Sequence, residues 1–172
     1  MMRREELAGA AFVALGANLP RGTGSPADTL RRALVALAGL SREPVAASGF
    51  YRSAPKDCPP GSPDYVNAVA VLQPLPEETP LSLLHKLQVI ERAEGRVRSG
   101  LRNEARTLDL DLLMFADCRL DTDTLVLPHP RAHERRFVLE PWCELAGPDW
   151  PLAGRTLSDW LRDCHDQPLQ RL

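Results

Sequence analysis

The stretch Arg106–Phe115 (RTLDLDLLMF) alternates carboxylates with leucines, and this alternation constrains the chain more than any other feature. A period of two is that of a β-strand, in which residues i and i+2 point to the same face. Asp109 and Asp111 would therefore stand side by side, with Cα atoms roughly 6–7 Å apart. Two like charges on an otherwise apolar strand repel each other and resist burial. Two divalent cations would relieve both problems, whereas the alternative is an edge strand with an acidic face in water.

The composition indicates a globular protein with one sizeable core. The chain has 172 residues, 44% of them hydrophobic, and a net charge of −2. This balance argues against a general nucleic-acid binder, which carries a large basic excess. No apolar run reaches transmembrane length, no apolar stretch follows the first charges as in a signal peptide, and the four cysteines form no C-x-x-C pair. We expect a cytoplasmic monomer with reduced thiols and no membrane or nucleic-acid partner: a polar extension over residues 1–9 and a single domain over 10–172.

Apolar periodicity and turn residues predict the element order β-α-β-β-α-β, followed by further helices. Strands are expected over residues 10–16, 45–51, 65–72 and 109–115, and helices from Ser25 to about Gly39 and over 81–94. A short strand at 125–127, a short helix from Arg131, helical turns over 137–145 and a helix over 157–165 would follow. This order predicts an α+β, ferredoxin-like fold, with an antiparallel sheet, helices on one face and additional C-terminal helices.

The loop before the carboxylate strand is rich in arginine. Its members are Arg96, Arg98, Arg102 and Arg106. Guanidinium groups suit phosphate oxygens, and a loop that leads into a metal site would serve a substrate combining polyphosphate with metal. The alternative is a solvated surface loop.

Two further features could contribute to a site. His129 lies between two prolines, which hold its backbone stiffly, so it could be a fixed donor to a phosphate or an unimportant turn residue. Tyr65 and Phe137 could enclose a flat heterocycle, although core packing is the more common role of such residues.

Four stretches, taken together and in order, are similar to one known family. They are ALGANL (14–19), FYRS (50–53) with PDYVNA (63–68), GRVR (95–98) with RTLDLDL (106–112), and PHPRAHER (128–135) with FVL (137–139). Over roughly residues 11–150 the chain resembles the 6-hydroxymethyl-7,8-dihydropterin pyrophosphokinase family of folate biosynthesis. The last two stretches are highly specific in combination.

The resemblance implies a reaction in which the hydroxymethyl oxygen of the pterin attacks the β-phosphorus of ATP, so that pyrophosphate is transferred and AMP leaves. It implies two Mg²⁺ ions held by Asp109 and Asp111, with Arg96 and Arg106 clamping the triphosphate as catalytic groups. The implied nucleotide contacts are Gln88 near the adenine, together with Arg98, Arg102, His129 and Arg135. The implied pterin contacts are Ser53, Tyr65, Asn67 and Phe137, with the two aromatic rings stacking on the pterin.

Three departures separate this chain from many members of the family. Asn103-Glu-Ala105 stands where many members have tryptophan followed by Gly-Pro, Ala17 replaces a common serine, and the loop over 56–62 differs. We expect retained activity with altered loop closure. The alternatives are a non-catalytic homologue that binds pterin or nucleotide, favoured by Asn103, and a ferredoxin-like RNA-binding module, disfavoured by the net charge.

Overall fold

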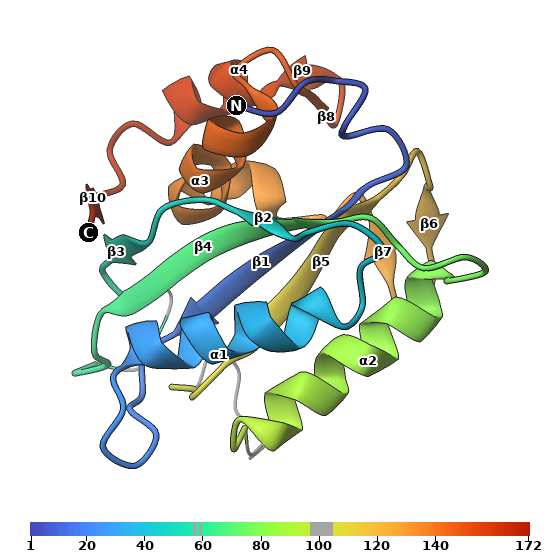
Figure 1. Ribbon diagram of the computed structural model, residues 1–172. Coiled ribbons are helices and arrows are strands. Elements are labelled where there is room, and N and C mark those ends of the chain that lie inside the picture. The colour runs from blue at the N-terminus through green and yellow to red at the C-terminus, as the bar shows by residue number, and fades with distance from the viewer. Residues whose placement is uncertain (57, 59, 97–104) are drawn as a thin grey trace.

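A six-stranded antiparallel sheet forms the centre of the computed structural model, which describes residues 1–56, 58, 60–96 and 105–172 (Figure 1). Its strand order is β10-β3-β4-β1-β5, and β2 pairs with β4 beside β3. The strands are β1 (Ala11–Ala17), β2 (Ala46–Ala47), β3 (Tyr51–Ser53), β4 (Tyr65–Leu72), β5 (Asp109–Phe115) and β10 (Leu169–Arg171). Short pairs lie outside the sheet: β6 (Leu120–Asp121) with β7 (Val126–Leu127), and β8 (Pro151–Leu152) with β9 (Arg155–Thr156).

The helices begin where the sequence supplies capping groups. The helix α1 (Pro26–Ala38) starts with a capping box between Ser25 and Asp28, and α2 (Pro80–Ala93) with one between Thr79 and Ser82. In both helices proline occupies the first position, where its missing N–H costs nothing. The remaining helices are the 3₁₀ turn η1 (Ala132–Glu134), α3 (Arg136–Ala146) and α4 (Leu157–Asp163). The predicted α+β order β-α-β-β-α-β with additional C-terminal helices is therefore confirmed.

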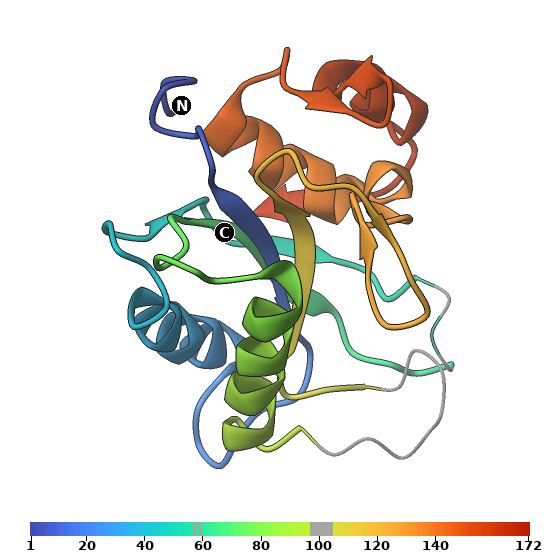
Figure 2. The same cartoon turned by 90° about the vertical axis from the view of Figure 1, so that its right-hand side faces the viewer.

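The helices form two layers on opposite faces of the sheet (Figures 1 and 2). The α1 and α2 side packs Leu30, Leu37 and Leu87 against Leu15 and Leu110. The α3 and α4 side packs a second core against the other face, and its members include Phe12, Val69, Trp142 and Leu157. The N-terminal residues join this second core: Leu7 is buried, and the Met2 N–H donates to the Leu145 carbonyl at 2.7 Å.

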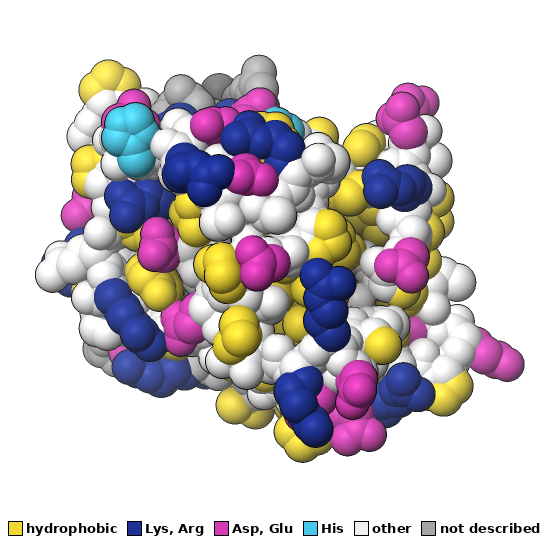
Figure 3. All heavy atoms as spheres, turned by 90° about the horizontal axis from the view of Figure 1, so that it is seen from above, with side chains coloured by type: hydrophobic (Ala, Val, Ile, Leu, Met, Phe, Trp, Pro, Cys, Tyr) yellow, Lys and Arg dark blue, Asp and Glu magenta, His cyan; other side chains and the backbone are white. Residues whose placement is uncertain are grey.

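Seen from above, the α4 side of the molecule carries basic and acidic side chains intermixed rather than one field of a single sign (Figure 3). Such a surface is unlike the basic face of a nucleic-acid-binding module. Among the described residues, no helix combines the length and apolarity needed to cross a membrane.

The strand expected over 45–51 is wrong as a single element, because Ser48 interrupts it. The buried Ser48 hydroxyl accepts the Val69 N–H at 3.0 Å, and the Ser48 N–H donates to the Val69 carbonyl at 2.9 Å. A side-chain oxygen thus replaces a backbone carbonyl in the ladder, and the chain divides into β2 and β3. The edge strand β10 was not predicted, because its segment has a single apolar residue, Leu169.

Replacing Ser48 with alanine should therefore destabilise the fold. The fully buried Val69 N–H would lose its acceptor, and an unsatisfied buried donor costs about 1–3 kcal/mol. Urea unfolding of Ser48→Ala should show a loss in this range, whereas the exposed Thr124→Ala should stay within about 0.5 kcal/mol of the parent. Equal stability of the two variants would contradict the role given to the Ser48 hydroxyl.

Candidate active site

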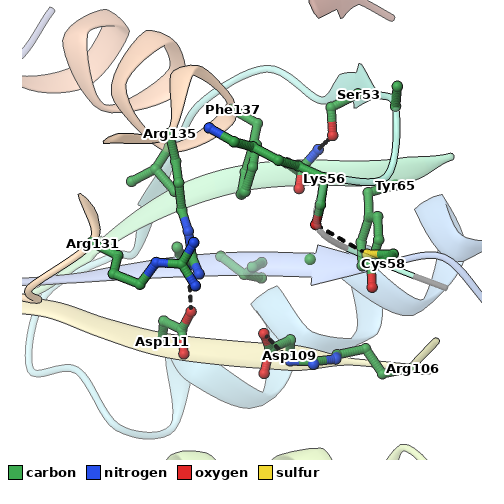
Figure 4. A pocket seen from close by; sticks show the side chains of 16 residues that line it. Ser53, Lys56, Cys58, Tyr65, Arg106, Asp109, Asp111, Arg131, Arg135 and Phe137 are labelled. Carbon is green, nitrogen blue, oxygen red and sulfur yellow. Dashed lines mark hydrogen bonds and ion pairs between the residues drawn. The ribbon is translucent and has the colours of Figure 1, made fainter. Parts of the chain in front are cut away.

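One transverse row of the sheet forms the floor of a cavity. Gly16 on β1 lies opposite Asn67 on β4 and opposite Asp109 on β5. In the next row on the same face, Ala14 lies opposite Asp111. Because β1 contributes only a hydrogen atom and a methyl group here, the polar side chains of both neighbouring strands border an open space beneath α3 (Figure 4).

The upper wall of this cavity carries two aromatic rings. Figure 4 shows Phe137 from α3 and Tyr65 from β4 next to each other along this upper wall, with Phe137 at the centre and Tyr65 to the right. Buried Asn67 donates its Nδ2–H to Ser53 Oγ at 2.9 Å and to the Tyr51 carbonyl at 3.3 Å, so its amide orientation is fixed. Its Oδ1 lies over Gly16 at the cavity floor. The cavity thus offers two ring faces and a fixed hydrogen-bond acceptor, features that suit a flat heterocycle with N–H groups.

Asp109 is neutralised by two arginines. Arg106 Nη1 lies 2.7 Å from its Oδ2, and Arg96 Nη1 is bound to its Oδ1. Burial raises the pKa of a carboxyl group, but the Arg106 and Arg96 charges outweigh burial and hold the pKa of Asp109 below its usual range. Asp109 is therefore ionised at neutral pH.

Asp111 is compensated less completely. Its Oδ2 lies 3.7 Å from Arg135 Nη1 and 3.9 Å from His129 Nε2, longer than a direct hydrogen bond. Burial, together with the negative charge of Asp109, raises the pKa of Asp111 to about 7. Among the described residues, the second carboxylate of the pair consequently has no cation within direct hydrogen-bond distance.

His129 presents a defined nitrogen to this centre. Its Nδ1 accepts the Arg131 backbone N–H at 3.1 Å, and its own backbone N–H donates to the Leu113 carbonyl at 2.8 Å. Burial, and next the charge of Arg135, lowers the pKa of His129 to about 4. The ring is neutral at pH 7, and because Nδ1 is an acceptor the proton resides on Nε2, which faces Asp111.

A second cavity of about 360 Å³ adjoins the first on the α2 side and meets it at the acid pair. Both cavities are lined by Arg106, Asp109, Asp111, Arg131 and Arg135. Only the second cavity includes Gln88, Glu91, Arg96 and His129. Two compartments that share a charged centre can bring a heterocycle and a polyphosphate together at one point.

The structure thus brings together most of the residues that the sequence suggested. Lining the two cavities are Ser53, Tyr65, Asn67, Gln88, Arg96, Arg106, Asp109, Asp111, His129, Arg135 and Phe137. Arg98 and Arg102 lie outside the described residues. The sequence reasoning missed Arg131, which lines both cavities, and Glu91.

Glu91 joins α2 to the acid strand. Its carboxylate, on a residue only 3% exposed, accepts the Leu110 N–H at 2.8 Å and also binds Arg96 Nη1. Leu110 stands between the two aspartates, and Arg96 contacts one of them, so Glu91 orients both components of the charged centre. Its position in the last turn of a helix gave no sign of this role, since Leu110 is 19 residues away.

The donor set at the acid pair fits a magnesium ion. Carboxylate oxygens are the ligands that Mg²⁺ prefers, and the ion usually takes one or two of them together with waters and substrate phosphates. Among the described residues, no group of three His, Cys, Asp or Glu side chains gathers as a complete metal cage. Substrate oxygens and water would supply the other ligands.

Paired carboxylates surrounded by arginines, at the junction of two cavities, are typical of enzymes that transfer phosphoryl groups. Comparison with known proteins identifies the family: residues 12–147 match the 7,8-dihydro-6-hydroxymethylpterin-pyrophosphokinase (HPPK) family. The chain belongs to this family, and the resemblance seen in the sequence is confirmed.

Individual relatives agree with this membership. A 2-amino-4-hydroxy-6-hydroxymethyldihydropteridine pyrophosphokinase from Haemophilus influenzae is 43% identical over 137 residues, which is 79% of this chain and 81% of the relative. The protein of the same name from Pseudomonas aeruginosa is 42% identical over 163 residues, 94% of this chain and 95% of the relative. A crystal structure of Plasmodium falciparum HPPK-DHPS shares the fold, with a TM-score of 0.67 and 13% identity, over 90% of this chain but 44% of that longer chain.

Removal of the Glu91 side chain should loosen the acid strand. Glu91→Ala would leave the Leu110 N–H without its acceptor and Arg96 without one of its two carboxylates, so we expect a loss of about 2–3 kcal/mol in urea unfolding. Glu91→Gln retains an acceptor for Leu110 and should lose less than half of that. If alanine and glutamine cost the same, the Leu110 hydrogen bond does not contribute as described.

Proposed function

We propose that this chain transfers pyrophosphate from ATP to the hydroxymethyl group of 6-hydroxymethyl-7,8-dihydropterin and releases AMP, in folate biosynthesis. Family membership and relatives of 42–43% identity named for this pyrophosphokinase support the reaction. The junction of the two cavities at Asp109 and Asp111 is the observation that supports the place of reaction, because a transfer between two substrates needs a shared centre.

In this proposal ATP occupies the cavity on the α2 side. Gln88 lies near the adenine, Arg96 and Arg106 clamp the triphosphate, and His129 donates from Nε2 to a phosphate oxygen, with Arg135 as a further cation. Arg98 and Arg102 would add phosphate contacts, and both lie outside the described residues. The protein does little covalent work in phosphoryl transfer, so positioning and charge stabilisation account for the rate.

The pterin occupies the cavity beneath α3. Tyr65 and Phe137 stack on its two faces, and the fixed Asn67 Oδ1 accepts from its N–H edge, with Ser53 holding the Asn67 amide. This arrangement directs the hydroxymethyl group toward the acid pair at the cavity junction. The aromatic walls also exclude water, which would otherwise compete as the acceptor.

Two Mg²⁺ ions bound by Asp109 and Asp111 would neutralise charge on the phosphates and activate the attacking oxygen. The incomplete compensation of Asp111 supports this assignment, because a cation would provide the partner that Arg135 and His129 supply only at 3.7–3.9 Å. With a cation held by Asp109, Arg96 and Arg106 would be available to bind the triphosphate.

The proposed unit is one pyrophosphokinase domain over residues 10–172, and the segment 1–9 precedes it. We propose that the protein acts as a monomer in the cytoplasm. The free thiols of Cys58, Cys118, Cys143 and Cys164 support a reducing compartment.

The test is AMP release from ATP and Mg²⁺, with and without the pterin. The parent should form AMP only when the pterin is present as acceptor. AMP identifies pyrophosphate transfer, because ordinary kinases release ADP.

Asp111→Asn should lower this rate at least about a hundredfold. Its melting temperature in metal-free buffer should not fall, because burial and Asp109 already disfavour the Asp111 charge. The exposed Asp117→Asn is the matched control and should keep the parental rate. Absence of pterin-dependent AMP in the parent would reject the proposal, and a normal rate in Asp111→Asn would reject the metal assignment.

Asn103→Trp should tighten pterin binding. Position 103, outside the described residues, carries a tryptophan in many members of the family, and an added aromatic contact is worth about 0.5–1.5 kcal/mol, or roughly 2–12-fold in Kd. Fluorescence titration with the pterin measures the change, and Asn103→Leu controls for added apolar area. Unchanged affinity would mean that the loop closes differently here.

The non-catalytic alternative, which Asn103 favours, predicts pterin binding without AMP formation.

A further inference from the structure

The last nine residues, 164–172, which we call the C-terminal tail, run from α4 to the edge of the sheet. They end as β10 beside β3 (Figure 1), where Leu169 pairs with Ser53, the residue that holds the Asn67 amide. The tail lies outside residues 12–147, which match the family. Nothing in the proposed chemistry uses it, yet it reaches the wall of the heterocycle cavity.

Gln167 ties the tail to the start of α3 at two points. Its Oε1 accepts the Arg136 N–H at 3.0 Å, and its Nε2–H donates to the Glu134 carbonyl at 2.9 Å. The two bonds lie on either side of Arg135, whose guanidinium faces Asp111. The start of α3 has no side-chain cap of its own, whereas α1, α2 and α4 all have capping boxes. Gln167 therefore caps this helix from a distant segment.

The backbone of the tail is held in turn by Arg136. Its Nη1 donates to the Gln167 carbonyl at 3.1 Å and to the His165 carbonyl at 3.3 Å. On the other side of the wall, Lys56 Nζ donates to the Glu134 carbonyl at 3.3 Å. The segment 134–137 is thus tied by polar bonds to the tail and to the loop after β3.

Phe137 is only partly buried where it packs against the α3 core. Phe137 also borders an open depression of about 250 Å³, together with Ser53, Lys56 and Gln167. A side chain that borders open space can shift, because few van der Waals contacts oppose the movement on that side. The two hydrogen bonds from Gln167 therefore contribute to where Phe137 stands.

We propose that Gln167 is a positioning residue for substrate binding: by capping α3 from the C-terminal tail, it sets the position of Phe137 at the wall of the pterin cavity. The consequence for the reaction rests on the proposed function, since it concerns the pterin. Gln88, Arg96 and Arg106 belong to segments that Gln167 does not contact, so the effect falls mainly on the pterin side.

The test compares Gln167→Ala with Gln170→Ala. Gln170 is a matched control, because it is the same residue type in the same tail, exposed, in β10 opposite Arg52. Loss of the two hydrogen bonds in Gln167→Ala should raise the KM for pterin about tenfold, with the KM for ATP within about twofold. Gln167→Glu retains an acceptor for the Arg136 N–H and should recover part of the loss. Gln170→Ala should match the parent.

Amide hydrogen exchange in the substrate-free protein provides a readout that needs no activity. Exchange at residues 136–138 should accelerate about tenfold in Gln167→Ala and not in Gln170→Ala. If the parent makes no AMP but exchange accelerates, the proposed function fails and the capping role stands. The inference is overturned if the KM for pterin stays within twofold of the parent, if both KM values rise together, or if exchange is unchanged.

Discussion

The pairing of β1 with β4 and β5 is the constraint on which the site depends. Val13 and Leu15 point into the core between the sheet and the helices α1 and α2. A slip of one residue in the strand pairing would turn both side chains to the opposite face, so the core fixes the register. The same register places Gly16 between Asn67 and Asp109. Apolar packing on one face of the sheet therefore sets the positions of the polar groups on the other, and the smallness of Gly16 leaves room for a ligand between them.

The acid pair is compensated unequally, and this inequality gives the centre its chemical character. Asp109 has two arginines in direct contact, while Asp111 has Arg135 and His129 only at 3.7 and 3.9 Å. The ion pairs with Asp109 place two guanidinium groups beside the proposed site of the phosphates, where negative charge would have to be stabilised.

The sequence predicted those features whose signals are local. The alternation around Asp109 and the capping residues at Ser25 identified a strand and a helix start, because each pattern is complete within one element. Contacts between distant segments could not be read in this way. Ser48 interrupts a strand by bonding Val69, and Glu91 acquires its role from the Leu110 N–H, so neither had a recognisable pattern in its own neighbourhood. Arg131 was not predicted as a site residue although it stands in a stretch that carried the family resemblance. Its place at the start of an expected short helix already accounted for an arginine there.

Both described ends of the arginine-rich loop are fixed at the charged centre. At one end, the Arg96 N–H donates to the Glu91 carbonyl at 3.0 Å while its side chain reaches Asp109. At the other, the Arg106 N–H donates to Oδ1 of buried Asn18 at 2.8 Å, and its carbonyl accepts the Asn18 N–H at 3.1 Å. Asn18 also binds the Pro63 carbonyl at 3.2 Å through Nδ2, so it links this loop to the segment that leads into Tyr65. The two arginines that contact Asp109 are therefore also held through their backbones, and Asn18 connects the Arg106 end to the segment that leads into Tyr65.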